Sequence, residues 1–229
     1  MNRIWPVIGV CALVLGGCAE ASRQAYTTHY TIAAPARSAL HGPTEPGSGK
    51  TLQVARMTVP PWLQGTDMDY RLDYLHDNRI AAYGRSDWVA PPAGLLEQMV
   101  RNAIAGDGFW RAVIGPASPA QADMSLHIRI DDFSQVFTSP QQSHGVLDAT
   151  ATLIGDRDDN VVAQKHFHIE APAPTADAPG GVEALKHVGR EFAARLQGWL
   201  RATVEHPHSG DSTARHRQAS GAHADGMDF

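Results

Sequence analysis

Apolar and polar residues alternate along several stretches of the chain, which is the pattern of half-buried β-strands. The clearest case is residues 122–133, where Leu126, Ile128 and Ile130 share one predicted face and polar side chains share the other. The predicted strands are, in chain order, residues 51–60, 68–75, 79–84, 122–133, 145–155 and 161–171. Short turns join the second strand to the third and the fifth to the sixth, so both pairs are predicted hairpins.

Two longer stretches repeat their apolar residues at helical spacing. The first begins at the pair Pro91-Pro92 and ends at Gly106, and the second begins after Pro179. Their apolar positions are Leu95, Leu96, Met99, Val100, Ala103 and Ile104 in the first, and Val182, Leu185, Val188, Phe192, Leu196 and Trp199 in the second. The chain therefore predicts an α/β fold, with a mixed β-sheet of about six strands covered on one or both faces by two main helices.

The amino terminus has the pattern of a bacterial lipoprotein signal. Arg3 supplies a positive charge, and residues 4–17 are mostly apolar or small, a segment of the length typical of a secretion signal. Leu15-Gly16-Gly17-Cys18 resembles the lipobox, in which small residues fit the signal peptidase and the cysteine thiol receives diacylglycerol. We therefore expect residues 1–17 to be removed and Cys18 to carry the lipid anchor.

The remainder divides by composition. Residues 18–50 are rich in Pro, Gly, Ala and Ser and predict an anchor and flexible tether, with one short apolar element, "HYTI". The folded domain is expected over residues 51–204, and the His-rich residues 205–229 are expected to be disordered. Lipoproteins retained at the inner membrane have Asp after the cysteine. Ala19 therefore predicts anchoring at the outer membrane, on its periplasmic face.

Charge and cysteine content exclude some functions. The formal net charge is -5, which argues against a nucleic-acid-binding protein. Cys11 lies within the predicted signal and Cys18 would be acylated, so no thiol remains for a disulfide or a cysteine metal site.

Two motifs resemble ligand-binding loops but lack required residues. Residues 49–51 ("GKT") end like a nucleotide-binding P-loop, yet Thr44 occupies the position of the first glycine, and a predicted strand follows where a helix is needed. Residues 156–160 ("DRDDN") resemble a calcium loop, yet Val161 and Phe167 replace the required Gly and Glu. We expect a linker and a hairpin turn instead.

The histidines raise the question of a metal site. His166 and His168 share one face of a predicted strand, and His127 lies on the polar side of another. Neighbouring strands would allow a three-histidine zinc site, but a solvated sheet face explains the same alternation. No metal or other cofactor is therefore predicted. Four more histidines are expected to belong to a soluble tail: His206, His208, His216 and His223.

No nucleophile–base pair is recognisable, so the chain predicts a binding or assembly role without catalysis. Trp62 follows Pro60-Pro61 in a predicted loop and is the favoured partner contact, since exposed tryptophans often anchor interfaces.

Several of these segments together resemble the ABC-type transport auxiliary lipoproteins, the PqiC-like group. The lipobox is followed by "HYTI", which is similar to their Tyr-Tyr-Thr-Leu-like segment, and its Tyr30 is a second candidate partner contact. Residues 52–72, 85–100 and 125–137 resemble their strand–Pro–loop–strand unit, their helix start and their long Phe-ended strand. The resemblance covers about residues 15–203. The "VAPP" that replaces an acidic helix start and the His-rich tail depart from it.

The resemblance implies a non-enzymatic accessory of an ABC/MCE-type (Pqi-like) lipid transport system, which would dock the periplasmic conduit at the outer membrane. The implied partners are an MCE-domain protein and the ABC or Pqi-type permease components, and members of the family can form homo-oligomers. The alternative is a periplasmic lipoprotein that itself binds lipid or another small ligand, which would require a deep apolar pocket.

Overall fold

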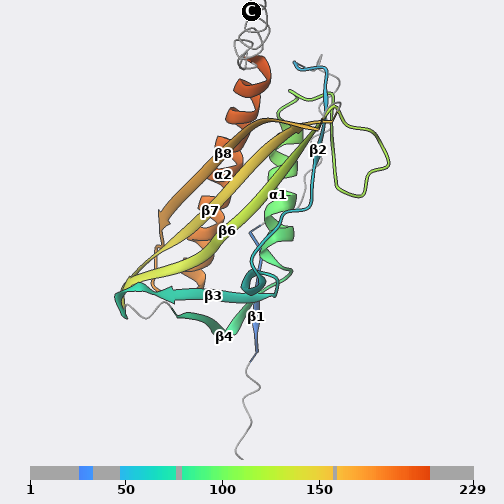
Figure 1. The fold of residues 1–229 in the computed structure, drawn as a ribbon. Coiled ribbons are helices and arrows are strands. Elements are labelled where there is room, and N and C mark those ends of the chain that lie inside the picture. Colours follow the sequence, from blue (N-terminus) through green and yellow to red (C-terminus); the bar gives the residue numbers. More distant parts are fainter. Residues whose placement is uncertain (1–25, 33–46, 76–78, 157–158, 207–229) are drawn as a thin grey trace, which may run out of the picture.

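The computed structural model describes residues 26–32, 47–75, 79–156 and 159–206. These residues form an eight-stranded mixed sheet, and two α-helices pack on one of its faces (Figure 1). The predicted α/β fold is confirmed, and both main helices lie on the same face of the sheet. The sheet exceeds the predicted six strands because two strands of three residues each extend its edges.

The three longest strands of the sheet lie side by side and antiparallel. They are β6 (Met124–Ser139), β7 (Gln142–Gly155) and β8 (Asn160–Pro172), each paired with the next along most of its length. The predicted β7–β8 hairpin is confirmed. β6 continues beyond the predicted end at Phe133, because a bulge between Ile130 and Asp132 resets the alternation and lets pairing proceed.

The other side of β6 pairs with two different strands. β2 (Thr51–Val54) runs parallel to the start of β6, and β3 (Asp67–Leu72) runs parallel to its end. Two further strands lie beyond these, β5 (Ala112–Ile114) beside β2 and β4 (Ile80–Trp88) beside β3. Because Thr51 begins a strand, the predicted strand after the "GKT" motif is confirmed, and no helix follows the motif as a P-loop requires.

One edge of the sheet comes from the segment that the sequence assigns to the tether. β1 (Thr28–Tyr30) pairs in parallel with β4, with Thr28 opposite Ser86. Ile32, two residues after the strand, is only 1% exposed and belongs to the core. The folded unit therefore includes residues on the amino-terminal side of residue 51.

The predicted apolar faces of both helices are confirmed as buried or packed against the core. α1 (Pro92–Gly106) ends at Gly106 as predicted. α2 (Ala178–Glu205) begins at Ala178, earlier than expected, because the Asp177 carboxylate caps it by accepting the N–H of Gly180 at 2.9 Å. Pro179 lies within the first turn, where its missing N–H costs no helical hydrogen bond.

The start of α2 contacts the sheet very closely, and glycines allow this. A Cβ atom on Gly180 would lie closer than 3.0 Å to the carbonyl oxygen of Thr175, and one on Gly181 would meet the side chain of Gln135. On the sheet side, Gly145 faces the backbone of Ala184. A side chain at Gly145 or Gly181 would push the helix away from the strands, and one at Gly180 would collide with the connection between β8 and α2.

A buried glutamine joins the helix start to three strands. Gln135 of β6 accepts a hydrogen bond from the Tyr83 hydroxyl of β4 at 2.9 Å. Its amide nitrogen donates to Ser143 Oγ of β7 at 2.8 Å and to the carbonyl oxygen of Asp177 at 3.1 Å. Since Gln135 is 0% exposed, these bonds satisfy a polar group that would otherwise destabilise the core.

Within the described residues, no helix is long and apolar enough to cross a membrane. The predicted signal, Cys18, Ala19 and the tail histidines 208, 216 and 223 lie outside the described residues.

Candidate functional site

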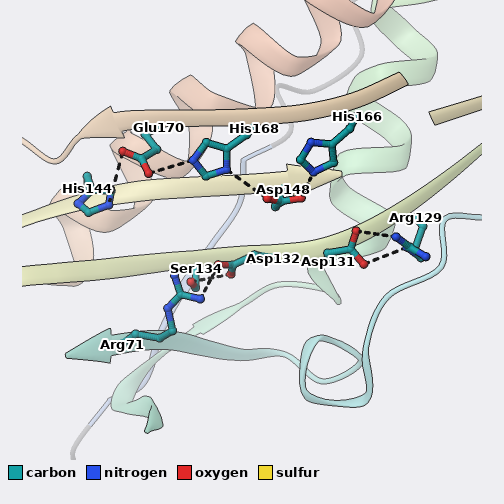
Figure 2. Close-up of polar contacts among 10 residues, drawn as sticks. All are labelled: Arg71, Arg129, Asp131, Asp132, Ser134, His144, Asp148, His166, His168 and Glu170. Carbon is teal, nitrogen blue, oxygen red and sulfur yellow. Dashed lines mark hydrogen bonds and ion pairs between the residues drawn. The ribbon is translucent and has the colours of Figure 1, made fainter. Parts of the chain in front are cut away.

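The face of the sheet opposite the helices carries a field of polar side chains from β6, β7 and β8, which we call the open face. Strand register arranges them in rows. The first row is His127, Thr152 and Gln164, the second is Arg129, Thr150 and His166, and the third is Asp132, Asp148 and His168. The predicted alternation is confirmed on β6, where Leu126, Ile128 and Ile130 are buried and His127, Arg129 and Asp131 are exposed. Figure 2 draws Arg129 and His166 of the second row, all three residues of the third row, and their neighbours.

A chain of histidines and carboxylates spans β7 and β8 on this face (Figure 2). Asp148 Oδ1 lies 2.5 Å from His166 Nε2, and Asp148 Oδ2 lies 3.1 Å from His168 Nδ1. The other ring nitrogen of His168 lies 3.1 Å from Glu170 Oε1, and His144 Nε2 lies 3.9 Å from Glu170 Oε2. Hydrogen bonds to Asp148 first, and then to Glu170, raise the pKa of His168 above its ordinary value.

The three histidines considered as zinc ligands do not converge. β7 separates β6 from β8, and His127 pairs across the sheet with Thr152, not with His166 or His168. His166 Nε2 and both ring nitrogens of His168 contact carboxylate oxygens instead. In the part of the chain that the structure describes, no group of His, Cys, Asp and Glu side chains is arranged to hold a metal ion.

The Asp148→Asn substitution is expected to lower the pKa of His168 toward its ordinary value. The reason is that Asp148 supplies the largest stabilisation of the protonated ring. NMR titration of the histidine ring protons measures this directly. Glu170→Gln is the matched control and should lower the same pKa by a smaller amount. A larger effect of Glu170→Gln would contradict this account.

A second ionic group lies where β3 meets β6, and the sequence pattern does not indicate it. Arg71 Nη1 contacts Asp132 Oδ2 at 2.6 Å, and the Ser134 hydroxyl donates to Asp132 Oδ1 at 2.7 Å (Figure 2). Burial raises the pKa of Asp132, although Ser134 and Arg71 act in the opposite direction. The guanidinium therefore compensates a carboxylate that lies largely out of water.

The two predicted partner contacts lie at the same end of the molecule. Trp62 lies in the short 3-10 helix Pro61–Leu63. In the loop after this helix, the carbonyl oxygen of Thr66 accepts a hydrogen bond from the N–H of Trp88 at 2.8 Å. The carbonyl oxygen of Tyr30 accepts the N–H of Val89, also at 2.8 Å. Both predicted side chains are partly buried against the core, so each offers only part of its ring to a partner.

Comparison with known proteins agrees with the family resemblance found in the sequence. A family model described as an ABC-type transport auxiliary lipoprotein component matches residues 30–197. A search of curated proteins finds no match. Among solved structures, a Xanthomonas campestris protein of the DUF330 family model is similar, with a TM-score of 0.63 and 20% identity over 79% of this chain and 95% of that one. An uncharacterized protein is similar with a TM-score of 0.58 and 15% identity, covering 76% of this chain and 99% of that one.

Proposed function

The chain belongs to the ABC-type transport auxiliary lipoprotein family, and on this basis we propose that it is a non-enzymatic accessory of an ABC/MCE-type (Pqi-like) lipid transport system. In this proposal it docks the periplasmic conduit at the outer membrane. The match over residues 30–197 carries the proposal, because it runs from the end of β1 into α2 and so spans nearly the whole folded unit. The family points to a role in transport without catalysis.

The anchor in this proposal is Cys18, and Ala19 directs it to the outer membrane. Several acyl chains on one residue hold a protein stably on a bilayer, whereas a single chain binds only marginally. Anchoring confines the domain to the membrane surface and raises its effective concentration for a partner that ends there.

The proposed docking surface is the end of the molecule where Trp62 and Tyr30 lie. Val89 at this end is 54% exposed, which adds apolar area beside the two partly exposed rings. A surface that combines aromatic rings with an exposed aliphatic side chain suits contact with another protein. The proposed partners are an MCE-domain protein and the ABC or Pqi-type permease components.

The test is recovery of partners with the tagged, lipidated full chain from native membranes. We expect an MCE-domain protein and ABC subunits to be recovered with the wild type. Cys18→Ala should leave the membrane fraction and lose these partners. Recovery of the lipidated protein alone, with bound lipid and no partner, would contradict docking and support the alternative function, a periplasmic lipid carrier.

A pair of tryptophan substitutions locates the contact. Trp62→Ala is expected to lower partner recovery, and Trp199→Ala is the matched control, since Trp199 is also partly buried against the core but belongs to α2. Thermal unfolding of both variants shows whether each still folds. Equal loss of partner in two folded variants would argue against the Trp62 surface.

A further inference from the structure

A polar pocket of about 160 Å³ lies on the open face, over residues of the first and second rows, and excludes the third row with Asp148 and His168. Its lining is unusual in composition, because every polar side chain in it can donate a hydrogen bond and no carboxylate takes part. The lining residues are Arg56, Thr58, His127, Ile128, Arg129, Thr150, Thr152 and Gln164. The formal net charge of the protein is -5, so this group of hydrogen-bond donors is not explained by a generally basic surface.

The backbone fixes the positions of the lining residues. The segment after β2 stays beside β6, since Thr58 donates its N–H to the Ile128 carbonyl oxygen at 3.0 Å and accepts the N–H of Ile130 at 2.9 Å. Arg56 and Thr58 are therefore held beside His127 and Arg129. The alternation of this segment supports the arrangement, because Met57 between them is buried and both neighbours are exposed.

The two arginines are available to a ligand. Arg129 pairs with Asp131 through two hydrogen bonds, Nε to Oδ1 at 2.9 Å and Nη2 to Oδ2 at 3.2 Å. These bonds use two of the five N–H donors of the guanidinium, and the Arg129 side chain is 64% exposed, so the remaining donors are open to a ligand. Arg56 is exposed and makes no ion pair within the residues that the structure describes. Guanidinium groups offer several N–H donors in a planar fork that fits phosphate oxygens.

We propose that this pocket binds a phosphate ester, either a free small molecule or the headgroup of a phospholipid. Arg56 and Arg129 would hold the phosphate oxygens, and the threonine hydroxyls and Gln164 would complete the donor set. The β8 strand that supplies Gln164 also exposes Val161 by 61% and Val162 by 40%, so apolar area lies next to the donors. This phosphate site would belong to the folded domain itself, so the proposal does not depend on docking to a partner protein.

The experiment measures dissociation constants by isothermal titration calorimetry, with the full lipidated chain in nonionic micelles. The probes are inorganic phosphate, glycerol 3-phosphate and phosphatidylglycerol added to the micelles, with diacylglycerol as the phosphate-free control. Arg56→Gln and Arg129→Gln are each expected to weaken binding of the phosphate probes about tenfold, the effect of losing a charged hydrogen bond. Arg190→Gln is the matched control, because Arg190 is exposed on α2, on the other side of the sheet.

The probes also separate the two sources of phosphate. Tighter binding of phosphatidylglycerol than of glycerol 3-phosphate, with the difference removed by Val161→Ser, would identify a lipid headgroup site. Equal affinities would identify a site for a soluble phosphate ester. Absence of binding by all three phosphate probes, or an equal loss of affinity in Arg190→Gln, would overturn the assignment whatever the outcome of partner recovery.

Discussion

The Gly180→Ala variant should lose about 3 kcal/mol of its free energy of unfolding, the upper end of the usual cost of overpacking, because the new methyl group overlaps a backbone atom. Gly180 lies in the first turn of α2, and its Cβ would collide with the carbonyl oxygen of Thr175. That oxygen cannot move aside as a flexible side chain would. The helix start would have to shift, which would disturb the hydrogen bonds of Gln135 at the same contact. Chemical denaturation followed by circular dichroism measures the loss.

Gly198→Ala in the same helix is the matched control, and it should have the opposite sign. Apart from its chain neighbours and the backbone of its own helix, no described atom lies within 4 Å of the Cβ position at Gly198. Alanine there should therefore raise the free energy of unfolding by about 0.5–1 kcal/mol, its ordinary advantage over glycine inside a helix. If both variants gained stability, the expected collision between a Cβ atom at Gly180 and the Thr175 carbonyl oxygen would be contradicted.

The Arg71→Met variant should lose about 3 kcal/mol of stability at pH 8, since removing one partner of a buried ion pair leaves the other uncompensated. Arg71 Nη1 lies 2.6 Å from Asp132 Oδ2, and the Asp132 side chain is only 12% exposed. Methionine keeps much of the length and apolar surface of the arginine stem. The loss should therefore come from the stranded carboxylate more than from packing.

The same variant should recover stability as the pH falls. The pKa of Asp132 is already raised above 3.8 in the folded protein, and loss of Arg71 removes an interaction that lowers it, so it rises further. A carboxyl with a higher pKa in the folded state than in the unfolded state binds its proton more tightly when folded. Protonation therefore adds stability as the pH falls through the folded pKa toward the unfolded value, and the deficit of Arg71→Met shrinks.

A double variant separates charge from shape at this site. Arg71→Met combined with Asp132→Asn removes the stranded charge, so it should be more stable at pH 8 than Arg71→Met alone and show a weaker pH dependence. Denaturation curves at pH 5 and pH 8 provide the comparison. A double variant as unstable as the single one at pH 8 would mean that packing, not charge, dominates at Arg71.

Local sequence pattern was enough for most of the architecture. Helical spacing identified the buried faces of α1 and α2, and strict alternation identified the exposed and buried sides of β6 up to Asp131. The β7–β8 hairpin followed from its turn residues. These features depend on neighbours in sequence, which is why they could be read without the fold.

The remaining features depend on residues far apart in the chain. The bulge at Asp131 turns Asp132 toward Arg71 of β3, a strand that is far away in the sequence but pairs with β6. No local sequence pattern indicates this contact. Arg56 reaches the open face only because its segment runs beside β6. The early start of α2 did have a local signal, since Asp177 precedes a first turn that contains proline, and this is a common N-cap arrangement.

If Cys18 carries the proposed lipid anchor, the place of β1 in the sheet limits the distance between the domain and the bilayer. A lipid at Cys18 would be separated from Thr28 by ten residue steps, which span at most about 35 Å, whereas a free tether up to residue 50 would span about 110 Å. β1 and the carboxyl-terminal end of α2 lie at opposite ends of the molecule (Figure 1). With so short a connection to the proposed anchor, the β1 end would stay near the lipid surface, and a conduit crossing the periplasm would have to reach almost to the bilayer to meet it.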